Sequence, residues 1–354
     1  MKIALVTDAW HPQVNGVVRT LEAVTGILRQ WGHDVLIISP DEYRSFPAPS
    51  YPEIRLGMTR ARSIGRRISE FGPDAIHLAT EGPLCISARR WCRRNNFEFT
   101  TAYHTQFPEY LAKRTHLSPR VFWSYIRWFH SASQAIMVST RSVRNQLRSE
   151  GLARVHHWSR GVDLQHFSPT APEPELFRDL PRPIQLYVGR VAVEKNIEAF
   201  LDTGQPGSKV VVGDGPALDD LRQRYPDTHF LGRKTGPELA GCYAGADVFV
   251  FPSRTDTFGL VLIEALACGT PVAAFPVTGP VDILTDSSGV MADNLDAAIS
   301  GALALDPADC RAAAQHYSWE ASARQFLDGL VPVDPRPSAH LSRRFLAKVM
   351  LARA

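Results

Sequence analysis

Residues 253–269 of this chain read SRTDTFGLVLIEALACG, and this stretch decides how the second half of the chain folds. The apolar run Leu260–Cys268 has almost no polar side, and Gly269 follows it where a left-handed helix cap is expected. The pattern predicts a short buried helix between two strand-like runs, Val248–Phe251 and Pro271–Phe275. A helix between two apolar strands is typical of an α/β fold with a parallel sheet.

The predicted helix carries one carboxylate, Glu264, among apolar neighbours. A buried carboxylate needs partners, because leaving it unpaired is costly in free energy. Asp256 precedes the helix on the turn that leads into it, where backbone N–H groups have no partner within the helix. Two acids at one helix start favour a site for hydroxyls and phosphates. The structural alternative is that Asp256 or Thr257 caps the helix and Glu264 pairs with an arginine in the core.

Length and composition indicate a soluble protein of two domains, since the chain has 354 residues and 44% of them are apolar. No run of 18 or more apolar residues occurs, and residues 1–8 read as a strand rather than a secretory signal, so a cytosolic location is expected. The 5 cysteines are scattered without metal-ligand spacing, which argues against bound zinc and against a disulfide framework.

Apolar strand-like runs alternate with helix-period segments along most of the chain, which is typical of βαβ units around parallel sheets. A segment rich in Pro and Glu, 166–183, interrupts this alternation and is interpreted as a linker. We therefore predict one Rossmann-like domain at 1–165, a second at 166–331, and a Pro-rich spacer with a basic amphipathic tail at 332–354. Ligands of such sheets bind at the carboxyl ends of strands.

Charge divides unevenly among these parts. Lys and Arg outnumber Asp and Glu by 9 in residues 1–165 and by 4 in 332–354, whereas the acids are in excess by 10 in 166–331. A basic first domain is expected to meet an anionic surface such as membrane lipid or nucleic acid. The tail segment Leu341–Ala352 alternates apolar and basic residues, so it is either an interfacial anchor or a solvated terminus.

A second basic segment interleaves aromatic residues on a predicted helix and contains Arg120, Trp123, Arg127 and Trp128. At a membrane interface, its rings would lie at the depth of the lipid headgroups and its arginines would meet phosphates. The alternative is a large aromatic core. Nucleic acid fits less well, because stacking platforms normally lie on open sheets and this stretch is predicted to be helical.

Two cations stand on the loop that follows the predicted strand Ile184–Val188, namely Arg190 and Lys195. Such a pair suits a diphosphate, because Arg can bind two oxygens at once and Lys supplies a compact charge. They could instead pair with Glu194 and Glu198 on the surface. No D-x-D triplet occurs in the sequence, so a metal ion as a phosphate clamp is not expected.

Two positions in the first domain also follow predicted strands. Gly16 stands at a helix entrance where a phosphate could approach bare backbone, although Asn15-Gly16 could simply form a turn. The loop lacks the G-x-G-x-x-G pattern, which argues against a dinucleotide site. His104 follows a buried strand and could point toward a ligand, but a lone histidine is more often structural.

Taken together, the chain resembles the retaining nucleotide-sugar glycosyltransferases of family 4, with the GT-B architecture of two facing Rossmann-like domains and a cleft between them. The resemblance covers nearly the whole chain. It rests on Asn15–Val17, His104 in Tyr-His-Thr, Arg160–Asp163, Gly189-Arg190 with Glu194–Asn196, and the segment Asp256–Glu264.

The resemblance implies a role for each site residue. Glu264 would hold the ribose hydroxyls of the donor, Arg190 and Lys195 would bind its diphosphate, and the backbone at Gly16 would reach the diphosphate from the opposite domain.

The hexose of the donor would be positioned by Asp256 and by the amides near Phe258, Gly259 and Leu260, while His104 would contact the sugar near its 6-position and the reacting centre. His104 and Asp256 would thus act in catalysis together with the two cations. The family usually has Glu where this chain has Asp256, so the preferred donor sugar stays open.

Within the family, the likeness is closest to bacterial lipid glycosyltransferases and sulfolipid-synthase-like enzymes. It implies transfer of a hexose from a UDP- or GDP-sugar to a membrane lipid such as diacylglycerol, without metal or other cofactor, by an enzyme peripherally bound to the inner face of the cell membrane. No nucleic-acid partner is expected. The alternatives are a soluble family 4 enzyme acting on a glycan or polysaccharide, for example a GDP-mannose-dependent mannosyltransferase, a nucleotide-sugar epimerase, a nicotinamide-dependent oxidoreductase, and a non-catalytic sensor of sugar nucleotides.

Overall fold

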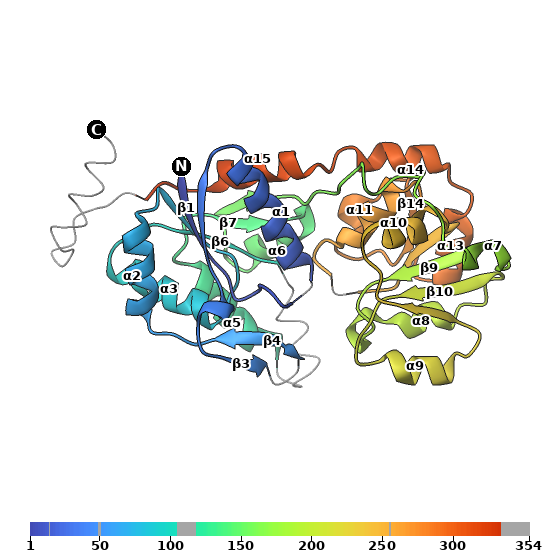
Figure 1. The fold of residues 1–354 in the computed structure, drawn as a ribbon, viewed down its shortest axis with the longest axis horizontal. Coiled ribbons are helices and arrows are strands. Elements are labelled where there is room, and N and C mark those ends of the chain that lie inside the picture. The colour runs from blue at the N-terminus through green and yellow to red at the C-terminus, as the bar shows by residue number, and fades with distance from the viewer. Residues whose placement is uncertain (14, 49–50, 105–117, 255, 334–354) are drawn as a thin grey trace. The chain divides into compact units, whose positions relative to one another are not determined.

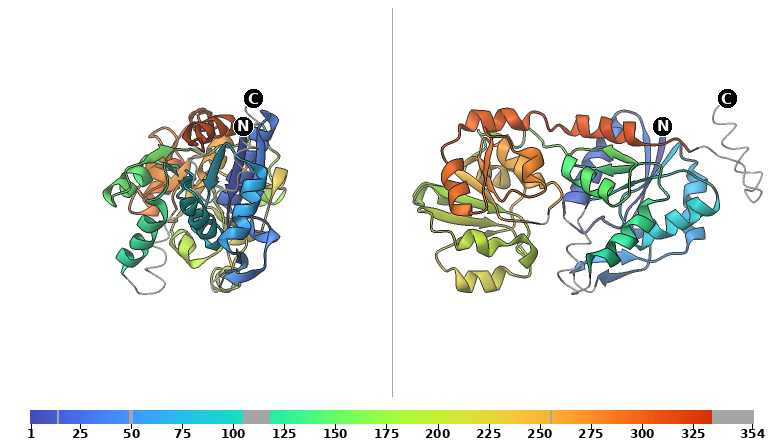
Figure 2. Two further views of the ribbon diagram at one scale, coloured as in Figure 1. Left: turned by 90° about the vertical axis from the view of Figure 1, so that its left-hand side faces the viewer. Right: turned by 180° about the vertical axis from the view of Figure 1, so that it is seen from behind.

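The computed structural model describes residues 1–13, 15–48, 51–104, 118–254 and 256–333. These residues form two compact units, Met1–Ser159 together with residues 320–333, and Arg160–Trp319. Each unit holds a parallel six-stranded sheet with helices packed on both of its faces (Figures 1 and 2). The predicted fold class, α/β with two Rossmann-like units, is confirmed.

The sheet of the first unit has the strand order β2-β1-β5-β6-β7-β8. Its strands are β1 (Lys2–Val6), β2 (Asp34–Ile38), β5 (Ala75–Leu78), β6 (Thr100–Ala102), β7 (Ile136–Val138) and β8 (Val155–His157), and an antiparallel ribbon is formed by β3 (Ser45–Ala48) and β4 (Tyr51–Gly57). The helices are α1 (Gly16–Gln30), η1 (Pro40–Glu42), α2 (Ala61–Phe71), α3 (Pro83–Arg94), α5 (Pro119–His130), α6 (Arg141–Ser149) and α15 (Trp319–Gly329).

Alternation along the central strands of this sheet builds two apolar layers. Ala4 and Val6 of β1 face the same side as Ile76 and Leu78 of β5, where they pack with α2 and α3. Leu5 pairs with His77 on the opposite face, which is covered by α15. Because both faces are buried, the central strands β1 and β5 are mostly apolar, as expected for a parallel sheet.

The unit boundary differs from the predicted domain boundary at the end of the chain. We expected residues up to 331 to belong to the second domain, but α15 packs on the first unit. Trp158 donates from Nε1 to Ser322 Oγ at 3.1 Å, and the rings of His77 and Phe326 lie 5.0 Å apart. An amphipathic helix near the end of a chain carries no sequence signal for which of two similar sheets it covers, so this return was not predictable.

His77 gives the first unit a pH-dependent stability. The imidazole is fully buried between Phe326 and Trp158, and burial lowers its pKa from 6.5 to about 3. Above pH 6.5 the folded and unfolded states are both neutral at this position. As the pH falls below 6.5 only the unfolded state takes up the proton, so the free energy of unfolding decreases.

We therefore expect His77 to make the unfolding free energy about 1 kcal/mol smaller at pH 5.5 than at pH 7.5, and the loss to continue toward pH 3. Urea unfolding at both pH values, for the native protein and for His77→Leu, measures this contribution as the difference between the two pH dependences. Equal dependences would show that His77 does not stay neutral in the folded state.

The sheet of the second unit has the strand order β11-β10-β9-β12-β13-β14. Its strands are β9 (Ile184–Val188), β10 (Ser208–Val212), β11 (His229–Gly232), β12 (Val248–Phe251), β13 (Val272–Ala274) and β14 (Gly289–Met291). The helices are α7 (Leu176–Asp179), η2 (Val193–Lys195), α8 (Ile197–Leu201), α9 (Leu218–Arg224), α10 (Gly236–Ala244), α11 (Leu260–Ala267), α12 (Pro280–Ile283), α13 (Leu295–Ala302) and α14 (Pro307–Ala314).

Two hydrophobic cores flank this second sheet. One core joins the sheet to α10, α11 and α14, and the other joins its opposite face to α8, α9 and α13 (Figure 1). The segment interpreted as a linker is packed into the first of these cores through Phe167 and Phe177, which are 4% and 1% exposed. The composition of 166–183 indicated a break in the βα alternation, but not that its aromatic residues are anchored.

Among the described residues, no helix combines the length and the apolar composition that a bilayer-crossing segment requires. Of the predicted spacer and tail at 332–354, residues 334–354, including Leu341–Ala352, lie outside the described residues.

Candidate active site

The loops after β9, β10 and β12 lie together at the carboxyl edge of the second sheet, because these strands are neighbours in it. The first two loops touch through their backbones. Val191 N donates to Asp214 O at 2.9 Å, and a Cβ atom added to Gly213 would lie 1.8 Å from the carbonyl oxygen of Gly189. Gly213 therefore has to lack a side chain for this edge to close.

The structure brings Lys195 and Asp256 together, although they are far apart in the sequence. Lys195 ends η2 after β9, Asp256 follows β12, and Lys195 Nζ lies 2.6 Å from Asp256 Oδ1. The neighbouring residue, Asn196, has a left-handed backbone (φ 54°), and its Nδ2 donates to Pro252 O at 3.0 Å. This hydrogen bond ties the loop after β9 to the loop after β12. Glu198, which we considered as a surface partner for Lys195, pairs with Arg224 instead.

The ion pair keeps Asp256 charged. Burial by itself would raise the pKa of this carboxyl, but the ammonium of Lys195 outweighs burial and holds the pKa below its usual range. Both side chains keep about a quarter of their surface exposed, 25% for Lys195 and 23% for Asp256. Lys195 therefore offers a partly exposed cation of the kind that interacts with phosphate, while the oxygen Oδ2 of Asp256 is buried beside it.

Arg190 lies on the same loop, directly after Gly189, and is half-buried. Its carbonyl oxygen accepts a hydrogen bond from the hydroxyl of Tyr187 at 2.9 Å, which fixes the backbone where the side chain leaves the strand. The two predicted cations thus belong to one loop with a restrained backbone.

Helix α11 begins where the sequence pattern predicted and ends one residue earlier, at Ala267. Gly259 precedes it with a left-handed backbone (φ 88°), and a side chain there would press against Leu262 and Phe251. Phe258 is buried, whereas Leu260 is half-buried at the helix start. The backbone groups at 258–260 follow Asp256 closely along the chain and lead into α11.

Glu264 is 2% exposed within α11. Its Oε2 accepts a hydrogen bond from the hydroxyl of Tyr243 at 3.0 Å, and Tyr243 is itself fully buried on α10. We did not single out Tyr243 from the sequence, because an aromatic residue on an apolar helix has the same pattern whether it fills the core or binds a carboxylate.

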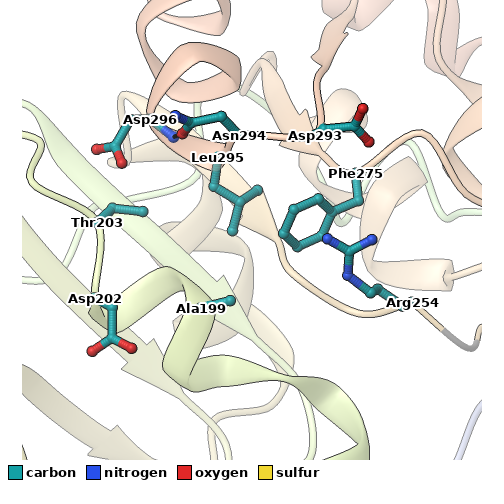
Figure 3. A pocket seen from close by; sticks show the side chains of 9 residues that line it. All are labelled: Ala199, Asp202, Thr203, Arg254, Phe275, Asp293, Asn294, Leu295 and Asp296. Atoms are coloured by element: carbon teal, nitrogen blue, oxygen red, sulfur yellow. Dashed lines mark hydrogen bonds between the residues drawn. The ribbon is translucent and has the colours of Figure 1, made fainter.

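Arg254, which was not identified as a site residue from the sequence, lies between β12 and α11 and contacts Phe275. Its guanidinium stacks on the ring of Phe275, 3.6 Å from the ring centroid, at a pocket of about 360 Å³ (Figure 3). Three acids, Asp202, Asp293 and Asp296, also line this pocket. The contact anchors the segment that places Asp256.

The predicted site residues of the first unit follow its strands as expected. Gly16 is the first residue of α1, and the side chain of Asn15 caps this helix by accepting from Val17 N and Val18 N, both at 3.0 Å. His104 follows β6, is 8% exposed, and meets the ring of Trp158 edge to face at 5.5 Å. Both residues stand at the carboxyl edge of the first sheet.

The four residues proposed for a membrane or acceptor surface do not share one environment. Trp123 is 5% exposed and stacks on Tyr103 in the core, so its predicted place on the surface is wrong. Arg127 pairs with Glu150 at 2.7 Å, whereas Arg120 is exposed. Trp128 is 40% exposed, and the guanidinium of Arg89 lies over its ring.

Trp123 and Trp128 lie five positions apart on α5, which turns their side chains to different faces. The aromatic residues of this segment therefore serve both a core and a surface.

Comparisons with known proteins show the family of the chain. The model of Glycosyltransferase Family 4 matches residues 14–166, and that of Glycosyl transferases group 1 matches residues 182–305. The chain is 32% identical over 309 residues to a GDP-mannose-dependent alpha-mannosyltransferase of Mycobacterium tuberculosis, covering 80% of this chain and 82% of that protein. It is 28% identical to the alpha-monoglucosyldiacylglycerol synthase of Streptococcus pneumoniae, covering 77% and 71%.

Among solved structures, sucrose-phosphate synthase from Thermosynechococcus elongatus superposes with a TM-score of 0.78 at 21% identity, covering 100% of both chains. This likeness supports the fold, while the family rests on the sequence matches. The chain belongs to the family 4 glycosyltransferases.

Proposed function

We propose that this glycosyltransferase moves a hexose from a nucleotide diphosphate sugar to the hydroxyl of a membrane lipid such as diacylglycerol, with retention of configuration and without a metal ion. The observation that carries the proposal is the Lys195–Asp256 pair at the carboxyl edge of the second sheet, on the loops that hold Arg190 and lead into the helix of Glu264. One edge thus offers groups for a diphosphate, a hexose and a ribose.

The reaction needs a stabilised leaving group more than it needs a base. The bond between the anomeric carbon and the diphosphate oxygen breaks, the acceptor oxygen forms the new bond on the same face, and its proton passes to the departing phosphate oxygen. Arg190 and Lys195 would stabilise the negative charge that grows on the diphosphate. Asp256 and the amides at 258–260 would hold the hexose, and His104 would contact it from the first unit.

Retention and the lipid acceptor are supported by the relatives. GDP-mannose carries its mannose in α linkage, so a GDP-mannose-dependent alpha-mannosyltransferase keeps the configuration of its donor. The Streptococcus pneumoniae relative is named for a glucosylated diacylglycerol.

The surface of α5 also supports a lipid acceptor. Val121, Tyr125 and Trp128 are 57%, 39% and 40% exposed, and their spacing of four and three positions places them on one face of the helix. Arg120 is exposed beside them, and residues 1–165 carry a net charge of +9. An apolar helix face on a basic unit suits an anionic membrane, so we place the enzyme peripherally on the inner face of the cell membrane.

Val121→Asp is expected to weaken binding to vesicles of phosphatidylglycerol and phosphatidylcholine by about 10-fold, because it replaces a side chain that would be buried in lipid by a charge. Sedimentation with the vesicles measures the effect. Val281→Asp is the matched control, since Val281 is a 44% exposed valine of the second unit. Equal binding of the two variants and the native protein would remove α5 from the membrane surface.

A screen of labelled UDP-glucose, UDP-glucuronate, UDP-galactose and GDP-mannose against a total lipid extract and a polysaccharide fraction tests the function. We expect a glycolipid product whose anomeric configuration matches that of the donor, formed equally in excess EDTA. Product only in the polysaccharide fraction would support the alternative of a soluble family 4 enzyme, which the mannosyltransferase relative keeps open. Conversion of a donor without any acceptor would indicate an epimerase, and loss of activity in EDTA would contradict the metal-independent mechanism.

A further inference from the structure

A buried hydrogen bond connects helix α10 to the carboxylate of Glu264 through Tyr243. Tyr243 lies near the end of α10, Glu264 lies in α11, and the two side chains are 0% and 2% exposed. The phenol hydroxyl donates to Glu264 Oε2 at 3.0 Å. A hydroxyl that donates to a buried carboxylate satisfies one of its oxygens and restricts its orientation.

The position of the Tyr243 hydroxyl is fixed by packing rather than by Glu264. The ring of Tyr243 meets Phe249 and Phe167 edge to face, with centroids 5.6 and 6.0 Å away. Its backbone is held as well, because Thr270 Oγ1 donates to the carbonyl oxygen of Tyr243 at 2.6 Å. The packing of the ring and the backbone therefore holds the hydroxyl of Tyr243 in position.

The carboxylate of glutamate, by contrast, rotates about a broad terminal torsion angle. We propose that Tyr243 is a positioning residue for donor binding, whose hydroxyl fixes the plane of the Glu264 carboxylate so that it meets the ribose hydroxyls of a nucleoside diphosphate in a ready orientation. This inference rests on the proposed function, in which Glu264 binds the ribose. Pre-orientation of this kind strengthens binding by lowering its entropic cost.

A purely structural role for Tyr243 has a different signature. If the hydroxyl only stabilised the fold, its loss would weaken the binding of all nucleotides alike. If it positions Glu264, its loss weakens only the binding that depends on ribose hydroxyls. Nucleotides that lack these hydroxyls therefore separate the two roles.

The test measures the binding of GDP, UDP and their 2′,3′-dideoxy analogues by calorimetry to the native protein and to Tyr243→Phe. Of GDP and UDP, we consider the one that binds the native protein more tightly. We expect it to bind Tyr243→Phe about 10-fold more weakly than the native protein, whereas its dideoxy analogue binds both proteins equally. Tyr225→Phe is the matched control, because it removes another hydroxyl–carboxylate hydrogen bond of the second unit, 2.6 Å from Tyr225 to Asp202. This control is expected to bind every nucleotide as the native protein does.

Four results would overturn the inference, and they distinguish its failure from that of the proposed function. A native protein that binds neither GDP nor UDP, or that binds ribose and dideoxy nucleotides equally, removes the proposed role of Glu264 and with it the role of Tyr243. A native protein that prefers ribose, together with a Tyr243→Phe variant that keeps the full preference, removes only the positioning role. Equal weakening of ribose and dideoxy binding in Tyr243→Phe shows a structural role.

Discussion

Replacing Lys195 by alanine is expected to lower turnover by about 100-fold or more at saturating donor, because it removes a positive charge that would face the leaving diphosphate. Lys195 is only 25% exposed, and its Nζ is held 2.6 Å from Asp256 Oδ1. The ion pair restrains the ammonium, so little reorganisation is needed as charge develops on the phosphate.

The same substitution changes Asp256. Burial raises the pKa of this carboxyl, and the ammonium of Lys195 is what holds it low. Without the cation, the pKa of Asp256 is expected to rise, so the acid limb of the rate profile should move to higher pH. A simple loss of fold would not move this limb.

Turnover and its pH profile are measured for Lys195→Ala, for Lys195→Arg and for a control. Arg224→Ala is a suitable control, because Arg224 is also a cation of the second unit paired with carboxylates, those of Glu198 and Asp220. We expect Lys195→Arg to recover part of the rate and Arg224→Ala to retain it. Native turnover in Lys195→Ala would exclude Lys195 from the mechanism.

The parts of this site that could be predicted from the sequence are those encoded locally. The helix that carries Glu264 was predicted because its apolar residues, the preceding turn and the closing glycine are contiguous. Lys195 was predicted because it stands on the loop after an apolar strand, and Asp256 because it lies on the turn that leads into the buried helix. Their contact depends on β9 and β12 being neighbours in the sheet, which places the two loops side by side. The parallel α/β pattern predicts such convergence at a strand edge, but not which loops meet.

The parts that could not be predicted depend on contacts between distant segments. Tyr243 meets Glu264 through the packing of α10 against α11, and α15 returns to the first unit through contacts of Phe326 and Ser322. Trp123 was expected on the surface because composition alone does not tell which face of an aromatic helix is buried. In each case the role of the residue depends on which distant residue it contacts, and the local sequence does not reveal that contact.

Glu264→Leu is expected to weaken the binding of GDP or UDP by about 100-fold or more, because two ribose hydroxyls would lose a charged acceptor, each hydrogen bond contributing about 1.5 to 3 kcal/mol. Calorimetry with the nucleoside diphosphate measures the loss, and the 2′,3′-dideoxy analogue should bind the variant and the native protein equally. A variant that binds the ribose nucleotide as the native protein does would remove Glu264 from the donor site.

Thermal unfolding of the same variants distinguishes a functional carboxylate from a structural one. A charge that is 2% exposed costs desolvation, and leucine fills a similar volume without this cost. Glu264→Leu alone leaves the buried hydroxyl of Tyr243 without this acceptor, so a modest loss of stability is expected. Adding Tyr243→Phe removes that hydroxyl, and the double variant should melt at or above the native temperature while binding nucleotide no better than Glu264→Leu. A carboxylate that serves only to bind a ligand adds no stability to the core, so its apolar replacement should not lower the melting temperature. A double variant that melted well below the native protein would therefore show that Glu264 stabilises the fold.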